Sequence, residues 1–439
     1  MGRGGEDDGS GRSGVMVGGR EHQDQERAHG YADGKATHLF HNIPDDDDAR
    51  YARSTPSRLS SPRSIRRMIA LAALLAVGAY YCWSMFLKDS SVEVWAARAE
   101  LAVGDDGTYG IERHRVDKNL VRLKSLDERL LPGGKADPDG KRRLVFVGDV
   151  HGCKKELMKL LRKVDFNEEL DHLVLVGDTI SKGPDNVGVL DELIRLNATS
   201  VRGNHEDNVL LEARRIAANE DESSITSSDD VKAARKKDKD RALLRTLKPR
   251  HLDYLHNMPL MLHIPSLPQA TGATKKKHSP IMEHMLVVHA GLVPGVNLKK
   301  QDPYFVMNMR SINRRTLVPS ALRAGKNAKP WFDIWNWYND KVFKHDSENQ
   351  VEPVSSLPES DPSVWFVGFW KNFFGKHKHA HSKPQVVIYG HDSHTGLQMH
   401  RWSKGLDSGC VGGGKLTTMV LDAKGHQEVF SVGCKNYRD

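Results

Sequence analysis

The chain has 439 residues and a formal net charge of +8, from 65 Lys and Arg against 57 Asp and Glu. This length fits one large catalytic domain with appendages better than three domains. The basic excess is compatible with a polyanionic partner or a membrane surface. The sequence has no zinc-finger spacing and no RNA-binding signature, so no nucleic-acid partner is expected. Four cysteines do not make a disulfide framework, and whether Cys410 and Cys434 pair stays open.

The N-terminal residues 1–65 are rich in Gly, Asp, Arg, Ser and His and poor in apolar side chains. Such a segment cannot bury enough apolar surface to offset the entropy lost on folding. We therefore expect a disordered tail. The acidic run Asp45–Asp48 is interpreted as part of this solvated tail rather than as a metal site.

Residues 68–87 (MIALAALLAVGAYYCWSMFL) contain no charged side chain. As a helix they would span a ~30 Å hydrocarbon core, which predicts a single transmembrane anchor. A signal peptide would begin nearer residue 1 and be shorter. Arginines precede the segment and only Lys88 follows closely, so the positive-inside rule predicts a cytosolic N-terminus and residues 88–439 across the membrane. This topology would expose the glycosylation triplet Asn197-Ala-Thr199.

From about Lys141 short β-rich runs alternate with helical periodicity. Strands are predicted at 144–147 and 173–176, each followed by an amphipathic helix, and a third short strand ends near Val201. The later half is richer in β-formers, so we expect an α/β (α+β) domain over residues 142–432. The later strands are predicted at 285–288, 385–389, 416–421 and 429–432.

Other stretches do not fit this pattern. Residues 88–141 are mixed and rich in Asp, Gly and Lys, and they are interpreted as a connector. Residues 219–240 and 265–280 are strongly charged or polar and are interpreted as mobile insertions. The basic runs Lys232–Lys239 and Lys371–Lys383 are compatible with contact to a long polyanion or with plain solvated loops.

Polar side chains follow five of the strands. Because parallel strands bring such residues to one edge of a sheet, we expect them to meet there. Oxygen and imidazole ligands without thiolates suit Mn, Zn, Fe or Co better than a soft metal. The stretches are Gly148-Asp-Val-His-Gly, Gly177-Asp-Thr-Ile-Ser-Lys-Gly, Arg202-Gly-Asn-His-Glu, Val288-His-Ala-Gly and Tyr389-Gly-His-Asp.

This ordered set resembles the calcineurin-like metallophosphoesterases, in the branch shared with serine/threonine phosphatases. The resemblance covers residues 142–432 and implies a β-sandwich flanked by helices with two divalent metal ions, Zn, Mn, Co, Fe or Mg. It implies a role for each matching residue. The first metal would take Asp149 and His151, Asp178 would bridge both metals, and the second would take Asn204, His289 and His391; His205 matches the general acid, and Arg202 and, in Met-Arg-Ser, Arg310 match phosphate contacts. Lys182 would help Arg202 neutralise the transferring phosphoryl group.

The second motif departs from the protein phosphatases. Their Asp-Arg-Gly ending is replaced by Ser181-Lys182-Gly183-Pro184, so the Asp that orients the catalytic His is missing. The Lys-Gly-Pro form resembles the ApaH-like phosphatases, as do the blocks 390–397 and 405–416. Bacterial members of that branch cleave diadenosine tetraphosphate, and membrane-anchored fungal members are vacuolar endopolyphosphatases.

The sequence thus predicts a type II membrane enzyme that cuts inorganic polyphosphate internally, using a hydroxide activated by two metal ions. The alternatives are a serine/threonine protein phosphatase, a diadenosine polyphosphate hydrolase, and a membrane-tethered binding protein with an inactive metal site. Competent side chains at all the matched metal positions argue against the last alternative. The resemblance to the fungal enzymes further predicts the vacuole membrane, with the catalytic domain in the lumen.

Overall fold

The computed structural model describes residues 62–82, 90–105, 107–111, 116–117, 119–219, 228–270, 284–349 and 385–438. Helix α1 (Pro62–Cys82) contains a stretch, Arg63–Tyr81, of mean hydropathy 1.3, which is long and apolar enough to cross a membrane. This helix overlaps most of the predicted anchor at 68–87. Residues 83–87 and most of the predicted tail lie outside the described part of the chain.

One sheet of the folded domain has the strand order β14-β13-β2-β3-β4. Strands β2, β3 and β4 run parallel, as expected for strands joined through helices, and β13 adds an antiparallel neighbour to β2. The bounds are Arg143–Val147 (β2), Asp171–Leu175 (β3), Thr199–Ser200 (β4), Lys415–Asp422 (β13) and Gln427–Gly433 (β14).

The second sheet has the order β1-β5-β6-β10-β12-β11, and a small sheet has the order β8-β7-β9. In the second sheet β6, β10 and β12 run parallel. The bounds are Leu123–Ser125 (β1), Met261–Ile264 (β5), Met285–Val288 (β6), Ser311–Asn313 (β7), Pro319–Ser320 (β8), Ala328–Pro330 (β9), Val386–Tyr389 (β10), Gln398–Met399 (β11) and Ser403–Gly405 (β12).

The two large sheets pack face to face around the main core. Strand β2 shows how: Leu144 and Phe146 join the core shared with the second sheet, while Val145 and Val147 join a separate core under the helices. Successive side chains of a strand point to opposite faces, so a strand buried on both faces is apolar throughout. The predicted β-sandwich flanked by helices is confirmed.

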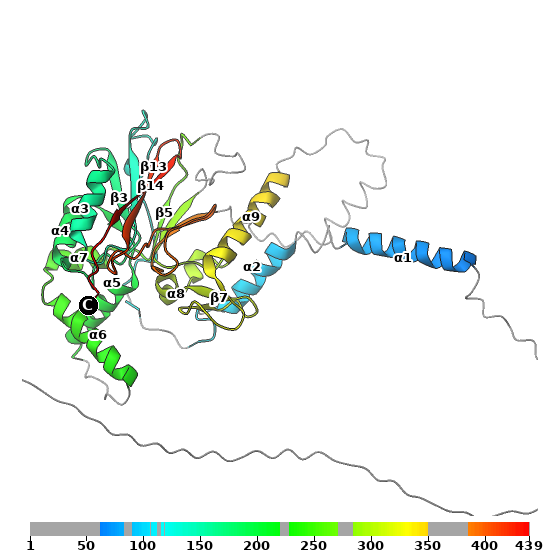
Figure 1. Cartoon of the computed structure of the whole chain (residues 1–439), viewed down its shortest axis with the longest axis horizontal. Helices are drawn as coiled ribbons and strands as arrows, with labels where there is room; N and C mark the ends of the chain where they lie inside the picture. The colour runs from blue at the N-terminus through cyan, green and yellow to red at the C-terminus, as the bar shows by residue number, and fades with distance from the viewer. Residues whose placement is uncertain are drawn as a thin grey trace, which may run out of the picture. The chain divides into compact units, whose positions relative to one another are not determined.

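Helices cover the outer faces of this sandwich. Figure 1 shows α3, α4 and α7 on one side of the sheets and α2 and α9 on the other. The bounds are Ser90–Val103 (α2), Lys154–Lys163 (α3), Asn186–Arg195 (α4), Asn204–Ala217 (α5), Ser228–Leu244 (α6), Pro249–His256 (α7), Pro303–Asn308 (α8) and Trp331–Asn349 (α9), with single 3₁₀ turns at Glu128–Leu130 and Leu298–Lys300.

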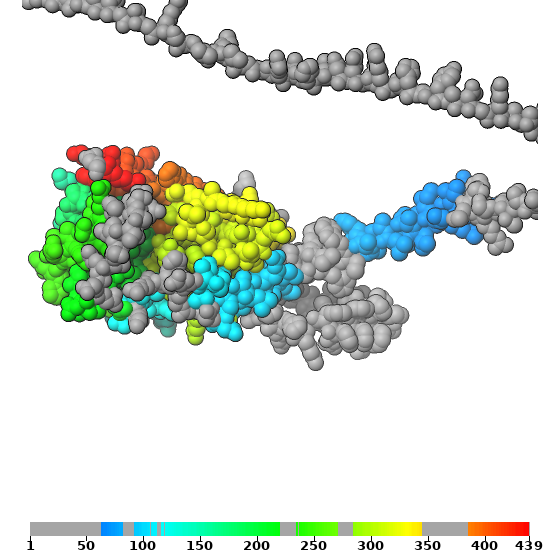
Figure 2. Space-filling model, turned by 90° about the horizontal axis from the view of Figure 1, so that it is seen from below, coloured from blue at the N-terminus to red at the C-terminus, as the bar shows by residue number. Residues whose placement is uncertain are grey.

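The segment interpreted as a connector belongs to the folded domain. Helix α2 lies beside α9 (Figure 2), where the Trp95 and Trp337 rings meet edge to face at 5.5 Å, and Ala99 and Val103 are fully buried. Strand β1 extends the second sheet by pairing with β5. Residues 95, 99 and 103 keep helical spacing, which the polar composition of the whole segment obscures.

The insertion predicted at 219–240 is helical from Ser228 onward, within α6. Ala, Lys, Arg and Leu favour helices, although the charge of this stretch suggested a loop. Arg241 Nε donates to Glu212 at 2.6 Å, and Leu243 and Leu244 pack against a small apolar cluster beneath α5 and α7. Most of the second insertion, predicted at 265–280, lies outside the described residues.

Candidate metal centre

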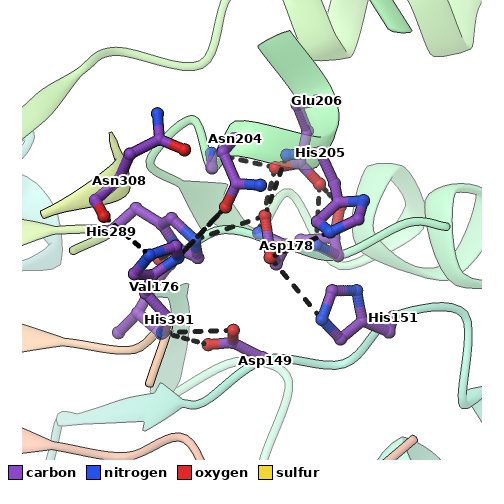
Figure 3. A network of polar contacts seen from close by, with 12 residues as sticks. Asp149, His151, Val176, Asp178, Asn204, His205, Glu206, His289, Asn308 and His391 are labelled. Atoms are coloured by element: carbon purple, nitrogen blue, oxygen red, sulfur yellow. Dashed lines mark hydrogen bonds and ion pairs between the residues drawn. The ribbon is translucent and has the colours of Figure 1, made fainter. Parts of the chain in front are cut away.

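The six predicted metal ligands all lie directly after strands or at the start of a helix. Asp149 and His151 follow β2, Asp178 follows β3, and Asn204 opens α5 just after β4. The other two, His289 and His391, follow β6 and β10 of the second sheet. The carboxyl ends of these parallel strands meet, so side chains from across the sequence converge in one place (Figure 3).

Four of these side chains aim ligand atoms at one small volume. Asn204 Oδ1 lies 3.1 Å from both His289 Nε2 and His391 Nδ1, which are 3.2 Å apart, and Asp178 Oδ1 lies 3.3 Å from His289 Nε2. Ligand atoms ~2.0–2.1 Å from a tetrahedral metal ion are ~3.3 Å apart. The donor set Asp178, Asn204, His289 and His391 therefore has the spacing and chemistry of a divalent metal site.

Each predicted metal-binding imidazole is oriented by a main-chain carbonyl on its far side. One ring nitrogen donates a proton to that carbonyl, which leaves the lone pair of the other nitrogen facing the centre. This arrangement is typical of histidines that bind metals. The pairs are His289 Nδ1 with Val176 O at 2.8 Å, His391 Nε2 with Asn308 O at 3.0 Å, and His151 Nδ1 with Ile180 O at 3.1 Å.

A second cluster shares Asp178. Its Oδ2 lies 3.5 Å from His151 Nε2 and 3.9 Å from His205 Nε2, so Asp178 faces both clusters as a bridging ligand would. Lys182 Nζ lies 3.1 Å from His151 Nε2. The lysine thus reaches the reaction centre, and a metal ion on His151 would displace its ammonium group from that nitrogen.

Asp149 is held against the second sheet. Its carboxylate accepts the main-chain N–H of His391, with N–O distances of 3.2 and 3.1 Å. Burial, followed by the charges of Asp407 and Asp178, raises the pKa of Asp149 well above its usual value. Burial likewise raises the pKa of Asp407. Three carboxyl groups are therefore buried together, which calls for compensating cations, and divalent metal ions fit this place.

The turn that carries Asp178 is held by a buried carboxylate. Glu206 accepts the N–H groups of Asp178, Thr179, Ile180 and Gly203 at 2.7–3.2 Å. Asp178 also has a positive φ of 50°, a strained conformation outside glycine. Positive φ also occurs at His151 (47°) and His391 (71°), so the packing around the centre holds the backbone in conformations it would not otherwise adopt.

Gly390 shows how closely the backbone approaches the centre. A Cβ atom at this position would lie 2.0 Å from Asp149 Oδ1, which no side chain can satisfy. The glycine before His391 therefore lets the second sheet deliver that histidine directly against Asp149.

Arg202 does not contact the site, so its predicted role as a phosphate contact is wrong in this structure. Its side chain is fully buried and is not among the residues that line the pocket. Arg202 Nη1 pairs with Asp117 at 2.9 Å, and Nη2 donates to His256 O at 2.9 Å. The motif match located the residue correctly at a strand end, but the partner Asp117 comes from the segment interpreted as a connector.

A pocket of about 220 Å³ opens over the centre. Arg310, Lys182 and His205 are among the residues that line it. Among the Asp, Arg and Lys side chains that line the pocket, sequence reasoning gave no role to three, of which Asp407 could have been found because it follows β12 as the other ligands follow their strands. The other two, Arg323 and Arg438, stand in no recognisable motif; Arg323 pairs with Asp392 at 2.5 Å.

Comparisons with known proteins agree with this geometry. The calcineurin-like phosphoesterase model matches residues 142–394, more than half of the chain. Symmetrical bis(5'-nucleosyl)-tetraphosphatases are similar to this chain: one from Tolumonas auensis is 29% identical, covering 66% of this chain and 97% of its own, and one from Shewanella putrefaciens is 31% identical, covering 63% and 94%. A solved diadenosine tetraphosphatase structure covers 72% of this chain and 98% of its own, with 25% identity and a TM-score of 0.46. The chain belongs to the calcineurin-like phosphoesterases, hydrolases that use two divalent metal ions.

Proposed function

We propose that this enzyme hydrolyses phosphoanhydride bonds and that its substrate is inorganic polyphosphate, cut within the chain. The observation that carries the proposal is the pocket lining. Four cationic side chains line it, while the described lining residues include no Phe, Tyr or Trp on which a nucleobase could stack. The cationic residues are Lys182, Arg310, Arg323 and Arg438. This composition favours a chain of phosphates over a dinucleotide.

The size of the pocket supports the same substrate. Its volume of about 220 Å³ is below the ~300–1,000 Å³ of pockets that enclose a whole drug-sized ligand. A compact phosphoryl group fits such a space, and the rest of a linear polyanion would continue outside it. The similarity to bis(5'-nucleosyl)-tetraphosphatases nevertheless makes a diadenosine polyphosphate the second candidate substrate, with the same bond broken.

The metal ions and the residues around them would have different roles in the reaction. When bound, the two metal ions supply an activated hydroxide and neutralise charge on the phosphoryl group. His205, part-exposed among the residues that line the pocket, would protonate the leaving oxygen. Lys182 and Arg310 would balance the negative charge of the substrate. A phosphoanhydride has a good leaving group, so the absence of a carboxylate partner from the second motif is tolerated.

We further propose a single-pass type II location with the domain in the lumen of the vacuole. Helix α1 supports an anchor by length and composition, with Arg63, Arg66 and Arg67 in its N-terminal turns, before the uncharged stretch. Cys410 and Cys434 form a disulfide, with a Cα–Cα distance of 5.2 Å, and disulfides persist in oxidising compartments. Asn197 is exposed, as a glycan acceptor must be. Expression in a eukaryotic cell tests the topology: a mass shift on glycosidase treatment, absent from Asn197→Gln, is expected, and the lack of any shift contradicts it.

A substrate panel tests the activity. The full chain, purified in detergent and loaded with Mn²⁺, Zn²⁺ or Co²⁺, is given long-chain polyphosphate, diadenosine tetraphosphate and a phosphoserine peptide. Internal cutting would convert long chains to medium lengths on gels before free phosphate accumulates. If the polyphosphate stays intact with every metal while the dinucleotide or the peptide is hydrolysed, the substrate proposal fails.

A further inference from the structure

The C-terminal end of the chain folds back along the wall of the pocket. Cys434 N donates to Gly414 O at 3.0 Å, and Tyr437 N donates to Val411 O at 2.9 Å. A β-bridge joins Gly412 to Asn436 between these contacts. The disulfide Cys410–Cys434 crosslinks the two segments at one end.

This arrangement places Arg438 in the pocket. Its guanidinium packs against Gly412, where a Cβ atom would lie 3.4 Å from Cζ. Arg438 lines the pocket together with Val411 and Cys410, from the segment to which the tail is linked. The residue at the very end of the described chain is therefore part of the binding surface.

The surroundings of Arg438 differ from those of the other two arginines that line the pocket. Arg310 and Arg323 both lie within 4.0 Å of the carboxylate of Asp392. Arg438 forms no ion pair with any acidic side chain in the part of the chain that the structure describes. Its guanidinium is therefore not paired with a carboxylate of the described residues, and it offers a planar set of N–H donors, which match phosphate oxygens.

We propose that Arg438 binds a phosphate of the substrate next to the one under attack, and that the Cys410–Cys434 disulfide holds it in place for this purpose. The inference rests on the proposed phosphoanhydride hydrolysis. Lys182 contacts the predicted metal ligand His151 and so serves the reacting group. Arg438 makes no such contact among the described residues. We therefore assign it to the neighbouring phosphate unit of the substrate.

The disulfide matters because it crosslinks the segment that carries Arg438 to the segment that lines the pocket. Besides the disulfide, the tail is held by a few hydrogen bonds, including Tyr437 Oη to Glu156 Oε1 at 3.0 Å. Without the crosslink these contacts would break more often, and Arg438 would spend less time in the pocket. The crosslink therefore acts on substrate affinity by positioning the arginine.

The test compares Arg438→Ala with Lys435→Ala, which removes an exposed charge from the same tail outside the pocket. KM is measured for tripolyphosphate and for p-nitrophenyl phosphate, which has no second phosphate. We expect Arg438→Ala to raise the KM for tripolyphosphate about tenfold more than that for p-nitrophenyl phosphate. Lys435→Ala should change the two values equally and by less than about twofold. Equal effects of Arg438→Ala on both substrates would overturn the proposal.

A second pair of variants tests the disulfide. The double variant Cys410→Ala/Cys434→Ala should also raise the KM for tripolyphosphate. Adding Arg438→Ala to this double variant should raise the KM little further, because both changes weaken the same contact between Arg438 and the substrate. Fully additive effects would show that the disulfide does not act through Arg438.

A binding measurement separates the failure of this inference from the failure of the proposed function. Calorimetry with the methylene-bridged analogue of tripolyphosphate, which cannot be hydrolysed at the bridge, reports affinity without turnover. If the wild-type chain hydrolyses no phosphoanhydride, weaker binding by Arg438→Ala still supports the inference, and unchanged binding overturns it.

Discussion

The carboxylate of Glu206 accepts the main-chain N–H of Asp178 at 2.9 Å, and this contact fixes the turn that presents Asp178 to both clusters of the metal centre. The same carboxylate accepts the N–H groups of Thr179 and Ile180. Glu206 is fully buried and bears no predicted ligand role, so its contribution is to orient a ligand. Outer residues of this kind strongly affect metal affinity.

Glu206→Gln should therefore weaken metal binding. The amide NH₂ group would face main-chain N–H donors, so the turn must shift and Asp178 with it. We expect a loss of roughly 10–100-fold in metal affinity, measured by competition with a chromophoric chelator. Glu168→Gln, which removes an exposed carboxylate paired with Arg195, is the matched control and should bind metal normally. Wild-type affinity in Glu206→Gln would contradict this role.

Asp407→Asn should have opposite effects on the metal-free and the metal-loaded protein. Removing one of three carboxyls buried together relieves repulsion, so the metal-free chain should melt at a higher temperature. The same change removes negative charge that attracts the cations, so the gain in melting temperature on adding Mn²⁺ should shrink. Calorimetry with and without chelator measures both. A larger metal-induced gain in the variant would show that Asp407 does not serve the metal centre.

Arg202→Met should act on stability rather than on substrate affinity. It removes the 2.9 Å partner of the buried Asp117, which keeps its ion pair with Arg214, and losing a hydrogen bond to a buried charged group costs about 2 kcal/mol. Chemical denaturation should show this loss, while the KM of the folded fraction should change by less than about twofold. A large rise in KM with unchanged stability would instead restore the phosphate contact that the sequence predicted.

Lys404 predicts a pH-dependent stability. Burial lowers the pKa of its ammonium group from 10.5 to about 8. Between about pH 8 and pH 10.5 the unfolded chain holds a proton that the folded chain has lost, so rising pH favours folding in this range. Below pH 8 the buried ammonium group is charged, and the full free-energy cost of burying that charge remains. Lys404→Met should thus stabilise the fold at pH 7 by about 2 kcal/mol, after loss of the hydrogen bond to His400 O.

The stabilisation by Lys404→Met should diminish toward pH 10, as followed by denaturant titration at each pH. Lys415→Met, at an exposed position of β13, is the control and should show no such trend. A stability difference that stays constant with pH would contradict the buried charge.

The strands and the ligands could be predicted because their signals are local. Each strand around the centre is an apolar run that ends at a polar residue, as in Leu144–Val147 followed by Asp149. The convergence of Asp178 and Asn204 then follows from the parallel direction of β3 and β4, whereas His289 reaches them from the second sheet through the packing of the two sheets. The family resemblance supplied the order of the motifs, and the geometry added the orienting carbonyls of Val176, Ile180 and Asn308.

The remaining contacts depend on pairings distant in the sequence. Arg202 was assigned to phosphate because nothing near it reveals Asp117, which lies 85 residues away. Helix α2 was missed because its few apolar residues are buried by packing against α9, which is distant in the sequence. Arg438 lies in the pocket beside a segment that the Cys410–Cys434 disulfide crosslinks, and the sequence could not decide whether these cysteines pair. Long-range partners of this kind cannot be read from composition or periodicity.

The central claim is that two metal ions held around Asp178 hydrolyse a phosphoanhydride. The most direct measurement is polyphosphate hydrolysis by the full chain, stripped with a chelator and then titrated with Mn²⁺, for the wild type and for Asp178→Asn. We predict no activity without metal, two Mn²⁺ bound per wild-type chain at full activity, and a rate roughly a thousandfold lower for Asp178→Asn. An Asp178→Asn enzyme that cleaves at the wild-type rate, or a stripped enzyme that stays active, would contradict the account.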